Sequence, residues 1–322
     1  MTLIERRKEF DRSEAKIYDS AILTFSGVEG YDVYNCSVPF RHNGKRYIFG
    51  RVEKRNEWAR SRTMLFEEVS PDHFCRVNNS MIYQTEDPNI AVIHGELVLG
   101  GIFVMYASVN MGSFYNLFYH GTDLEDMYYF ATGPVNMKDI RLVELPDHRI
   151  GVFSRPRNEE IIRKFGSESQ IGFTVINDIS ELSGDVIQNA PYIPGIFGDG
   201  EWGGCNQAYS LESGKIGVIG HKSYQTGKPG IEGLSTYLCI AFVFDPETHS
   251  VLEEKIIATS KSFPAHDAKR PHVADCAFTS GIVPREDGKV DLYSGLGDST
   301  EGRITIDNPF EKYGKILTPL QF

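Results

Sequence analysis

The chain has 322 residues and a formal net charge of −11, with 44 Asp and Glu against 33 Lys and Arg. This acidic balance argues against a protein that binds a nucleic-acid backbone, because such a protein would show a basic face. No apolar stretch reaches the length of a membrane span, and the charged N-terminus lacks the apolar centre of a signal peptide. We therefore expect a cytoplasmic protein that binds neither nucleic acid nor membrane.

The five cysteines are odd in number and form no CxxC pair, which indicates buried reduced thiols rather than a disulfide framework. His266, Asp267 and His272 stand close together in the sequence but lack the tight spacing of a metal site. The chain also has no P-loop and no glycine fingerprint for a dinucleotide. We expect neither a metal nor a cofactor.

In chain order, residues 2–16 predict a short helix or strap, and a pattern that occurs five times follows. A polar residue opens an apolar run, a tight turn follows, and a second apolar run ends in a basic residue or glycine. The openings are Asn35, Asp87, Asp139, Asn206 and Asp275. A hairpin repeated at roughly 50 to 75 residues is typical of a propeller, in which each repeat is one blade. We predict an all-β, five-bladed β-propeller with four strands in each blade, forming a single domain over 1–322, with residues 1–20 as a strap outside the blades.

The predicted blades are separated by turns and by two longer loops. They cover about 21–69, 83–124, 137–179, 206–258 and 275–306. The loops 189–204 and 260–274 are rich in Gly, Pro, aromatic or charged residues. Long loops on a rigid scaffold often carry function, so we expect these two at the mouth of the central channel.

The phase of the repeat predicts two rings of side chains. Seven residues after the turns stand Arg51, Ile102, Arg155, His221 and Gly295. Equivalent positions of successive blades lie around one axis, so these five should form one ring and the five openings another. Carboxylates and bases gathered in this way suggest a site for an anionic or sugar substrate. The competing interpretation is that Asn and Asp are simply good turn formers.

Single positions carry more specific predictions. Pro88 disfavours helical geometry at Asp87, so its carboxylate is held at the start of a strand, where it could serve as a general acid. We expect it near the cations but not paired to them, because a carboxylate bound to Arg would be a poor acid. Lys138 and Arg155 flank one predicted hairpin, and two cations at one strand end can clamp a phosphate. The alternative is that Lys138 and Arg155 form surface ion pairs with Asp139 or Glu144. Trp202, in a Gly-rich loop, could stack on a sugar ring.

The ordered motifs resemble a known family. They are Phe49-Gly50-Arg51-Val52-Glu53, Ser61-Arg62, Glu86-Asp87-Pro88, Lys138-Asp139, Ser154-Arg155-Pro156, Gly220-His221 and the run from Tyr293 to Asp298. The chain resembles the five-bladed β-mannoside phosphorylases of glycoside hydrolase family 130. It is more similar still to the mannosyltransferase/phosphorylases of glycosyltransferase family 108. Asn89 stands where the family 130 motif continues with Arg.

The resemblance implies an inverting β-1,2-mannoside phosphorylase/mannosyltransferase, with a small carbohydrate and inorganic phosphate as substrates. It makes Asp87 the proton donor and assigns phosphate to Lys138 and Arg155, with His221 nearby. Together with the rings, the expected substrate-binding residues are Asn35, Arg51, Arg62, Asp139, Asn206, Asp275, Asp298 and Trp202. Two alternatives stay open: an inverting hydrolase, which needs a second carboxylate roughly 6.5–9.5 Å from the first, and a non-catalytic glycan-binding propeller. The oligomeric state is also open.

Overall fold

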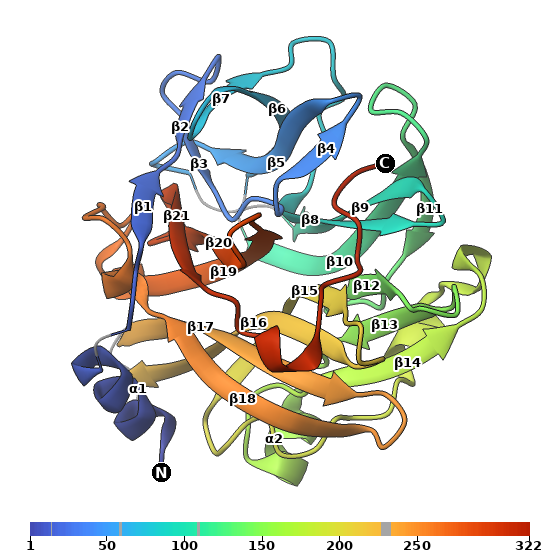
Figure 1. Cartoon of the computed structure of the whole chain (residues 1–322), viewed down its shortest axis with the longest axis vertical. Helices are drawn as coiled ribbons and strands as arrows, with labels where there is room; N and C mark the ends of the chain where they lie inside the picture. Colours follow the sequence, from blue (N-terminus) through green and yellow to red (C-terminus); the bar gives the residue numbers. More distant parts are fainter. Residues whose placement is uncertain (14, 58–59, 108–109, 227–232) are drawn as a thin grey trace.

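Over the residues that it describes (1–322 except 14, 58–59, 108–109 and 227–232), this computed structural model is an all-β protein. Four hydrogen-bonded sheets stand around a common centre, as in a propeller (Figure 1). The α-helices among the described residues are α1 (Leu3–Arg12), α2 (Glu159–Phe165) and α3 (Gly184–Gln188). None of these helices combines the length and apolar character that crossing a bilayer would require.

The N-terminal sheet is built from the first repeat. Its strands are β2 (Thr24–Ser26), β3 (Asp32–Tyr34), β4 (Phe40–His42), β5 (Lys45–Glu53), β6 (Arg62–Ser70) and β7 (His73–Arg76). The turn between β4 and β5 is Asn43-Gly44, and both residues have positive φ, at 48° and 77°. Asn-Gly favours this geometry, so the sequence fixes the hairpin locally.

The next two repeats each form a separate antiparallel sheet. The four-stranded sheet contains β8 (Glu86–Ile93), β9 (Glu96–Ala107), β10 (Asn110–Gly121) and β11 (Tyr128–Thr132). The three-stranded sheet contains β12 (Arg141–Glu144), β13 (Ile150–Ser154) and β14 (Gly172–Ile176). The expected fourth strand of this repeat is missing from the described residues, and the helices α2 and α3 lie in this part of the chain instead.

The last sheet has eight strands and consists of two antiparallel groups. One group is β15 (Trp202–Ser210), β16 (Ile216–Thr226), β17 (Leu234–Asp245) and β18 (Ser250–Ala258). The other is β19 (Asp275–Pro284), β20 (Lys289–Leu296), β21 (Thr300–Asp307) and β1 (Asp19–Ile22). Among the described residues, two pairs in parallel register between β17 and β19 join the groups. The N-terminal strand β1 thus completes the sheet of the C-terminal strands.

The hydrophobic core lies between neighbouring sheets. One cluster packs Phe40 and Phe49 of the first sheet against Ile90 and Leu99 of the second. A second cluster unites the three-stranded sheet with β15, β16 and β17. Every residue of β8 is buried, because this strand is covered on both faces. The apolar layers thus hold the sheets together and leave the polar ends of the inner strands to meet at the centre.

Candidate active site

The predicted site residues meet at one end of the inner strands. Strand β5 carries Arg51 near its C-terminal end, and strand β8 begins with Glu86 and Asp87. Strands β5 and β8 run in opposite senses, so the end of β5 and the start of β8 fall at the same end of the sheets. A cavity of about 290 Å³ opens there. It is lined by Asn35, Arg51, Glu86, Asp87, Lys138, Arg155, Arg157, His221, Ser235, Tyr237, His272, Val273, Cys276, Phe278 and Asp298.

The backbone turns sharply where the site carboxylates stand. Asn35, Asp87 and Asp139 have φ of 45°, 49° and 60°, and Asp298 has 54°. This left-handed region is uncommon for non-glycine residues, but Asn and Asp tolerate it best. At Asp87 the register of β8 and β9 also shifts, between the pairs formed by Glu86 and Asn89. Bulges and strained residues of this kind concentrate beside active sites, where they aim a side chain.

Arg51 is the centre of a buried group of carboxylates. Its Nη1 lies 2.8 Å from Asp87 Oδ1, and its Nη2 lies 3.1 Å from Glu86 Oε2 and 3.6 Å from Glu53 Oε2. The Nε of Arg51 donates to Ser61 Oγ at 2.7 Å. Glu53 is also paired with Lys269. One guanidinium therefore orients two of the three acids that line the cavity, Glu86 and Asp87.

The pKa values of the neighbouring acids Glu86 and Asp87 are shifted in opposite directions. Burial raises the pKa of Glu86, and Asp87 adds to this effect against the opposing attraction of Arg51. Burial also acts to raise the pKa of Asp87, but Arg51, Lys138 and a hydrogen bond from Asn35 Nδ2 (2.9 Å) together lower it. A proton shared by this pair therefore resides on Glu86. The sequence predicts an Asp87 that lies near cations without pairing to them, and this prediction is wrong because Arg51 binds it directly.

Cationic side chains line the same cavity. Lys138, Arg155 and Arg157 all line it. Arg155 donates from Nε (2.9 Å) and Nη2 (2.5 Å) to Asp139 Oδ2, so the ion-pair alternative holds for Asp139 while Arg155 still faces the cavity. Within the described part of the chain Lys138 has no ion pair, and its Nζ lies 6.0 Å from the centre of the Phe114 ring. Its charge is therefore available to an anion.

His221 is a neutral imidazole beside these cations. Burial lowers the pKa of His221 to about 3, and Arg155 and Lys138 contribute, while Asp139 opposes. Its Nδ1 lies 2.7 Å from Asn206 Oδ1, which fixes the ring. Asn206 and Asp139 thus lie behind the cavity lining. They bind His221 and Arg155, which line the cavity. The same cations, foremost Arg155, keep the pKa of Asp139 far below its usual range although burial acts to raise it.

Asp275 does not join the ring, and this prediction is wrong. Its carboxylate binds Arg7 of α1 at 2.8 and 3.1 Å and accepts hydrogen bonds from Thr236 and Ser260. The bulge of the fifth repeat comes later, between Thr279 and Gly281, so Asp275 opens the apolar run too early to reach the centre. Asp298 lines the cavity from this part of the chain, and burial raises its pKa.

Two further predicted residues lie outside the cavity lining. Trp202 is buried, donates from Nε1 to Tyr237 Oη at 3.2 Å and lies under the guanidinium of Arg157 at 5.4 Å. It therefore supports two lining residues and presents no open face to a sugar. Arg62 lines an adjoining cavity of about 260 Å³, which shares Glu86 with the first.

Sequence reasoning missed Glu86, Arg157, Tyr237 and Phe278 as lining residues. Glu86 stands next to Asp87, and its position in the motif was the available signal. Tyr237 and Phe278 lie in runs that look like ordinary core strands, and no local signal separates them from core. Across the described residues, no three His, Cys, Asp or Glu side chains come together as a potential metal site.

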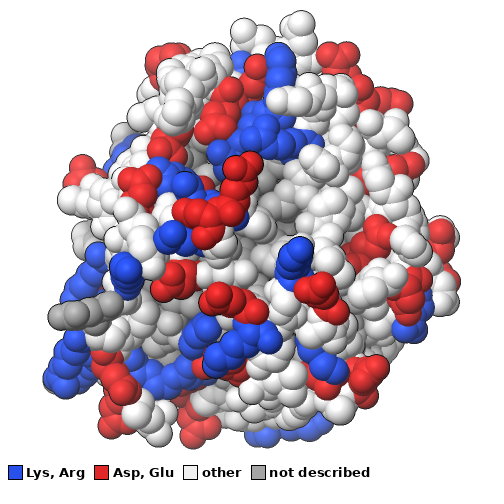
Figure 2. Space-filling view, in the orientation of Figure 1, with Lys and Arg blue, Asp and Glu red and all other residues white. Residues whose placement is uncertain are grey.

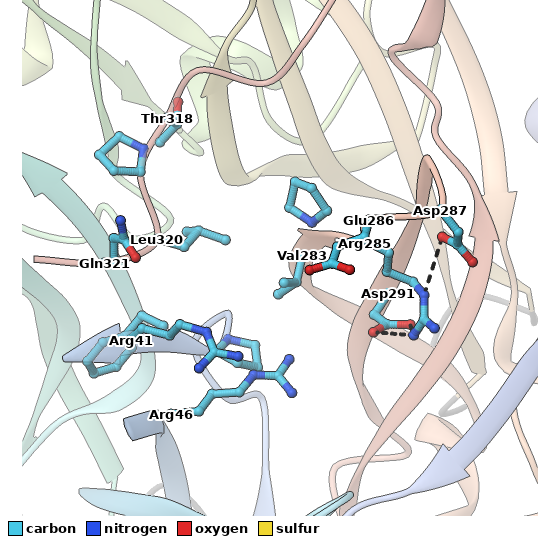
Figure 3. A pocket seen from close by; sticks show the side chains of 14 residues that line it. Arg41, Arg46, Val283, Arg285, Glu286, Asp287, Asp291, Thr318, Leu320 and Gln321 are labelled. Carbon is cyan, nitrogen blue, oxygen red and sulfur yellow. Dashed lines mark hydrogen bonds and ion pairs between the residues drawn. The ribbon is translucent and has the colours of Figure 1, made fainter. Parts of the chain in front are cut away.

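Another cavity, of about 770 Å³, lies at the opposite end of the same strands. Arg46 near the start of β5 lines it, whereas Arg51 near the end of β5 lines the candidate site. Arg285 is paired there with Asp287 and Asp291 (Figure 3), and Arg46 is paired with Glu68. The face crossed by the C-terminal segment has acidic and basic side chains interspersed (Figure 2). Three arginines (Arg41, Arg46 and Arg285) and three acidic residues (Glu286, Asp287 and Asp291) line this cavity, so its charges largely balance.

Comparisons with known proteins agree with this geometry. A family model described as a protein of unknown function, DUF1861, matches residues 8–312. The chain belongs to this family. MPT-4, a mannose phosphorylase from Leishmania mexicana whose structure is a complex with a phosphate ion, shares 46% identity with a TM-score of 0.93. The alignment covers 99% of this chain and 97% of MPT-4.

MPT-1, a GDP-Man-dependent mannosyltransferase from Leishmania mexicana, is 42% identical over 100% of this chain and 99% of its own, with a TM-score of 0.92. The β-1,2-mannobiose phosphorylase of Listeria innocua is 14% identical over 87% of this chain and 91% of its own, with a TM-score of 0.59, which shows a shared fold alone. A search of curated proteins gave no match. The resemblance drawn from the sequence motifs is confirmed, and the chain is an enzyme of this glycoside phosphorylase and glycosyltransferase group.

Proposed function

We propose that this protein is an inverting β-1,2-mannoside phosphorylase and mannosyltransferase, built as one five-bladed propeller domain. The observation that carries the activity is a single cavity in which an acid pair on Arg51 faces the cations Lys138, Arg155 and Arg157. The similarity to MPT-4, a mannose phosphorylase bound to phosphate, supports the same assignment. The blade count is supported by the eight-stranded sheet, whose two groups are joined by two residue pairs among the described residues.

The cationic side of the cavity would receive inorganic phosphate. Lys138 offers an unpaired ammonium group, and Arg155 is held in place by Asp139. Guanidinium and ammonium groups bind phosphate oxygens through strong charge-assisted hydrogen bonds. Neutral His221, whose Nδ1 donates to Asn206 Oδ1, can accept a hydrogen bond from a sugar hydroxyl at Nε2.

The reaction is a single displacement. A phosphate oxygen forms a bond to the anomeric carbon of the terminal mannose as the bond to the glycosidic oxygen breaks. The glycosidic oxygen gains a proton, so the products are mannose 1-phosphate and a shortened oligosaccharide. Phosphate is itself the nucleophile, so one acid suffices, whereas an inverting hydrolase must also activate water. Synthesis is the same step in reverse.

Asp87 is the proposed proton donor, and the neighbouring Glu86 supplies the proton that Asp87 donates. Arg51 lowers the pKa of Asp87, which would make it a poor acid on its own. A phosphate dianion entering the cavity adds negative charge beside the pair, which raises the pKa of both carboxyls. Glu86, whose pKa is already raised, then acts as the proton reservoir on the same guanidinium.

The direct test is incubation with β-1,2-mannobiose, with and without inorganic phosphate, followed by phosphorus NMR of the products. We expect mannose 1-phosphate to form only when phosphate is present. Free mannose without phosphate would instead establish the hydrolase alternative. Binding of the disaccharide without turnover in either case would establish the non-catalytic glycan-binding alternative.

A nucleotide-sugar donor is the second candidate, because MPT-1 is a GDP-Man-dependent mannosyltransferase. The same cations could hold a diphosphate in place of phosphate. Incubation of the protein with GDP-mannose and a mannose oligomer tests this candidate. Release of GDP with elongation of the oligomer would support it, and elongation by mannose 1-phosphate alone would exclude GDP-mannose as the required donor.

A further inference from the structure

Glu53 and Lys269 form a buried ion pair behind the acid pair of the candidate site, Glu86 and Asp87. The Glu53 side chain is fully buried on β5, and the Lys269 side chain is 2% exposed. Over the described residues, neither of them lines the candidate cavity, so neither touches a substrate bound there. A buried ion pair often adds no more stability than apolar residues of similar size. Its effect on the neighbouring Arg51 is the part that bears on the reaction.

The main chain at Lys269 is fixed against the turn between β20 and β21. The N–H of Lys269 donates to Gly297 O at 2.7 Å. Gly297 has a φ of 56° and approaches the loop so closely that a Cβ there would lie 2.9 Å from Ala268 Cα. The side chain of Lys269 therefore reaches the first sheet from a fixed point near the last one, and its partner Glu53 is 216 positions away in the sequence.

Glu53 contacts two cations among the described residues, and Lys269 is the closer one. Lys269 Nζ binds Glu53 Oε2 directly, whereas Arg51 Nη2 lies 3.6 Å from the same oxygen. The shorter contacts of Arg51 go to the acid pair, at 2.8 Å to Asp87 and 3.1 Å to Glu86. Lys269 thus satisfies Glu53 and leaves the guanidinium of Arg51 to the acid pair.

The charges of this buried group balance when the acid pair holds one proton. Arg51 and Lys269 are then the cations, and Glu53 and the ionised acid of the pair are the anions. Removal of Lys269 would leave a negative charge in excess, and removal of the Glu53 charge would leave a positive one. Because a low-dielectric site disfavours an excess charge, the acid pair would hold its proton more tightly in the first case and less tightly in the second.

We infer that Lys269 is a positioning residue, which neutralises Glu53, reserves Arg51 for the acid pair and so sets the pH at which the pair gives up its proton. This inference rests on the proposed function. Burial raises the pKa of Asp298, and Lys269 is one of the cations that oppose this effect, so Asp298 should respond in the same direction as the pair.

Other titratable groups act on the buried group from the remaining elements and are unchanged in the variants that test the inference. These groups are Lys138, Arg141, Asp298, Tyr34, Tyr106 and Arg60.

The test measures kcat/KM for β-1,2-mannobiose at saturating phosphate over a range of pH in Lys269→Met, Glu53→Gln and the double variant. Phosphorolysis needs a proton on the acid pair, so activity falls as the pH rises through the pKa of the pair. This fall should come at higher pH in Lys269→Met and at lower pH in Glu53→Gln. The double variant should return to the wild-type curve, because both charges are then absent. Midway down the wild-type fall, the two single variants should differ roughly tenfold in activity relative to their own maxima.

Lys215→Met is the control, because Lys215 is paired with Asp245 at 3.0 Å away from the cavity lining. It removes a lysine from an ion pair and should leave the curve in place. A uniform loss of activity without a shift, or shifts of both single variants in the same direction, would overturn the inference. If Lys269→Met does not fold, the shift in Glu53→Gln and its reversal in the double variant decide the matter in the same way.

If the wild-type protein forms no mannose 1-phosphate, the proposed function fails, and the inference is judged by NMR titration of labelled aspartate and glutamate carboxyl carbons. Displacements of the acid-pair titration in opposite directions in the two single variants would still support the role of Lys269. Titrations that coincide with the wild-type curve in both variants would remove it.

Discussion

The ion pair between Asp87 and Arg51 is the central contact of the site. The left-handed backbone at Asp87, with φ of 49°, turns its carboxylate into the cavity and onto the guanidinium. Asp87→Asn keeps the size of the side chain and removes the transferable proton. We expect turnover of β-1,2-mannobiose to fall by roughly 10²–10⁴-fold, the usual contribution of general acid catalysis, with little change in sugar binding.

The control for this substitution is Asp287→Asn, the same chemical change on an exposed turn. It should leave turnover intact. Near-normal activity of Asp87→Asn would contradict the assignment and transfer the role of proton donor to Glu86, which shares the same arginine.

Lys138 and Arg155 both line the cavity, but their removal should affect the stability of the protein differently. Lys138 has no ion pair among the described residues, so Lys138→Ala should raise the KM for phosphate by at least roughly tenfold without a change in unfolding free energy. Arg155→Ala should lose phosphate binding and also leave the buried Asp139 with the more distant Arg141, 3.8 Å away, in place of a partner at 2.5 Å. Breaking a buried pair in this way costs about 3–5 kcal/mol.

Steady-state kinetics with varied phosphate and urea unfolding of both variants check this contrast. Sugar binding, measured without phosphate, should be little affected by Lys138→Ala. A Lys138→Ala protein that keeps its phosphate KM, or an Arg155→Ala protein as stable as the wild type, would contradict the assigned roles.

Strand β21 carries a buried carboxyl that makes stability depend on pH. Glu301 accepts hydrogen bonds from Cys36 N and Ser280 Oγ but has no cationic partner among the described residues. Burial raises the pKa of Glu301 to about 7. Its folded-state pKa is above the unfolded one, so its contribution to stability is fully present below about pH 4.5 and is lost as the pH rises through about 7.

The loss should amount to on the order of 3 kcal/mol between those limits. Glu301→Gln keeps the shape and one acceptor oxygen, so the difference in unfolding free energy between variant and wild type should grow in favour of the variant as the pH rises from 5 to 8. Urea titrations of both proteins at several pH values give this difference directly. A constant difference across the range would show that Glu301 does not titrate there.

At the scale of elements, the repeat in the sequence predicted the positions of the strands more accurately than those of the site residues. The turns at Asn43-Gly44 and Asp287-Gly288 have local chemistry that fixes them, and the hairpins follow. The bulge that separates Asp275 from the centre depends on packing around Tyr209 and Gly281, which no local pattern reveals. The Arg51–Asp87 contact likewise joins two repeats, so its pairing depends on how the sheets are placed around the axis.

At the scale of the whole molecule, the ring is closed by the pairing of β1 with β21. Removal of residues 1–12 takes away α1 alone, which is anchored by Arg7 on Asp275 and by Arg6 on Glu254. Removal of residues 1–22 also exposes the edge of β21. We expect the longer truncation to lower the unfolding midpoint by more than the shorter one, by several degrees, because it removes an entire strand pairing.

Calorimetry of the two truncated proteins measures this difference. The shorter truncation should keep phosphate-dependent activity, since none of the residues lining the candidate cavity lies in α1. Equal midpoints for the two proteins would show that β1 adds nothing to the closed ring.

The same closure sets the order in which the protein can be completed during its synthesis. Strand β1 leaves the ribosome well before its partner β21, because residues 23–299 separate them. At ~5–20 residues per second, β1 waits on the order of tens of seconds before it can pair. The nascent protein therefore carries an open strand edge while those residues are made, and a chaperone that shields short apolar edges would have its binding site there.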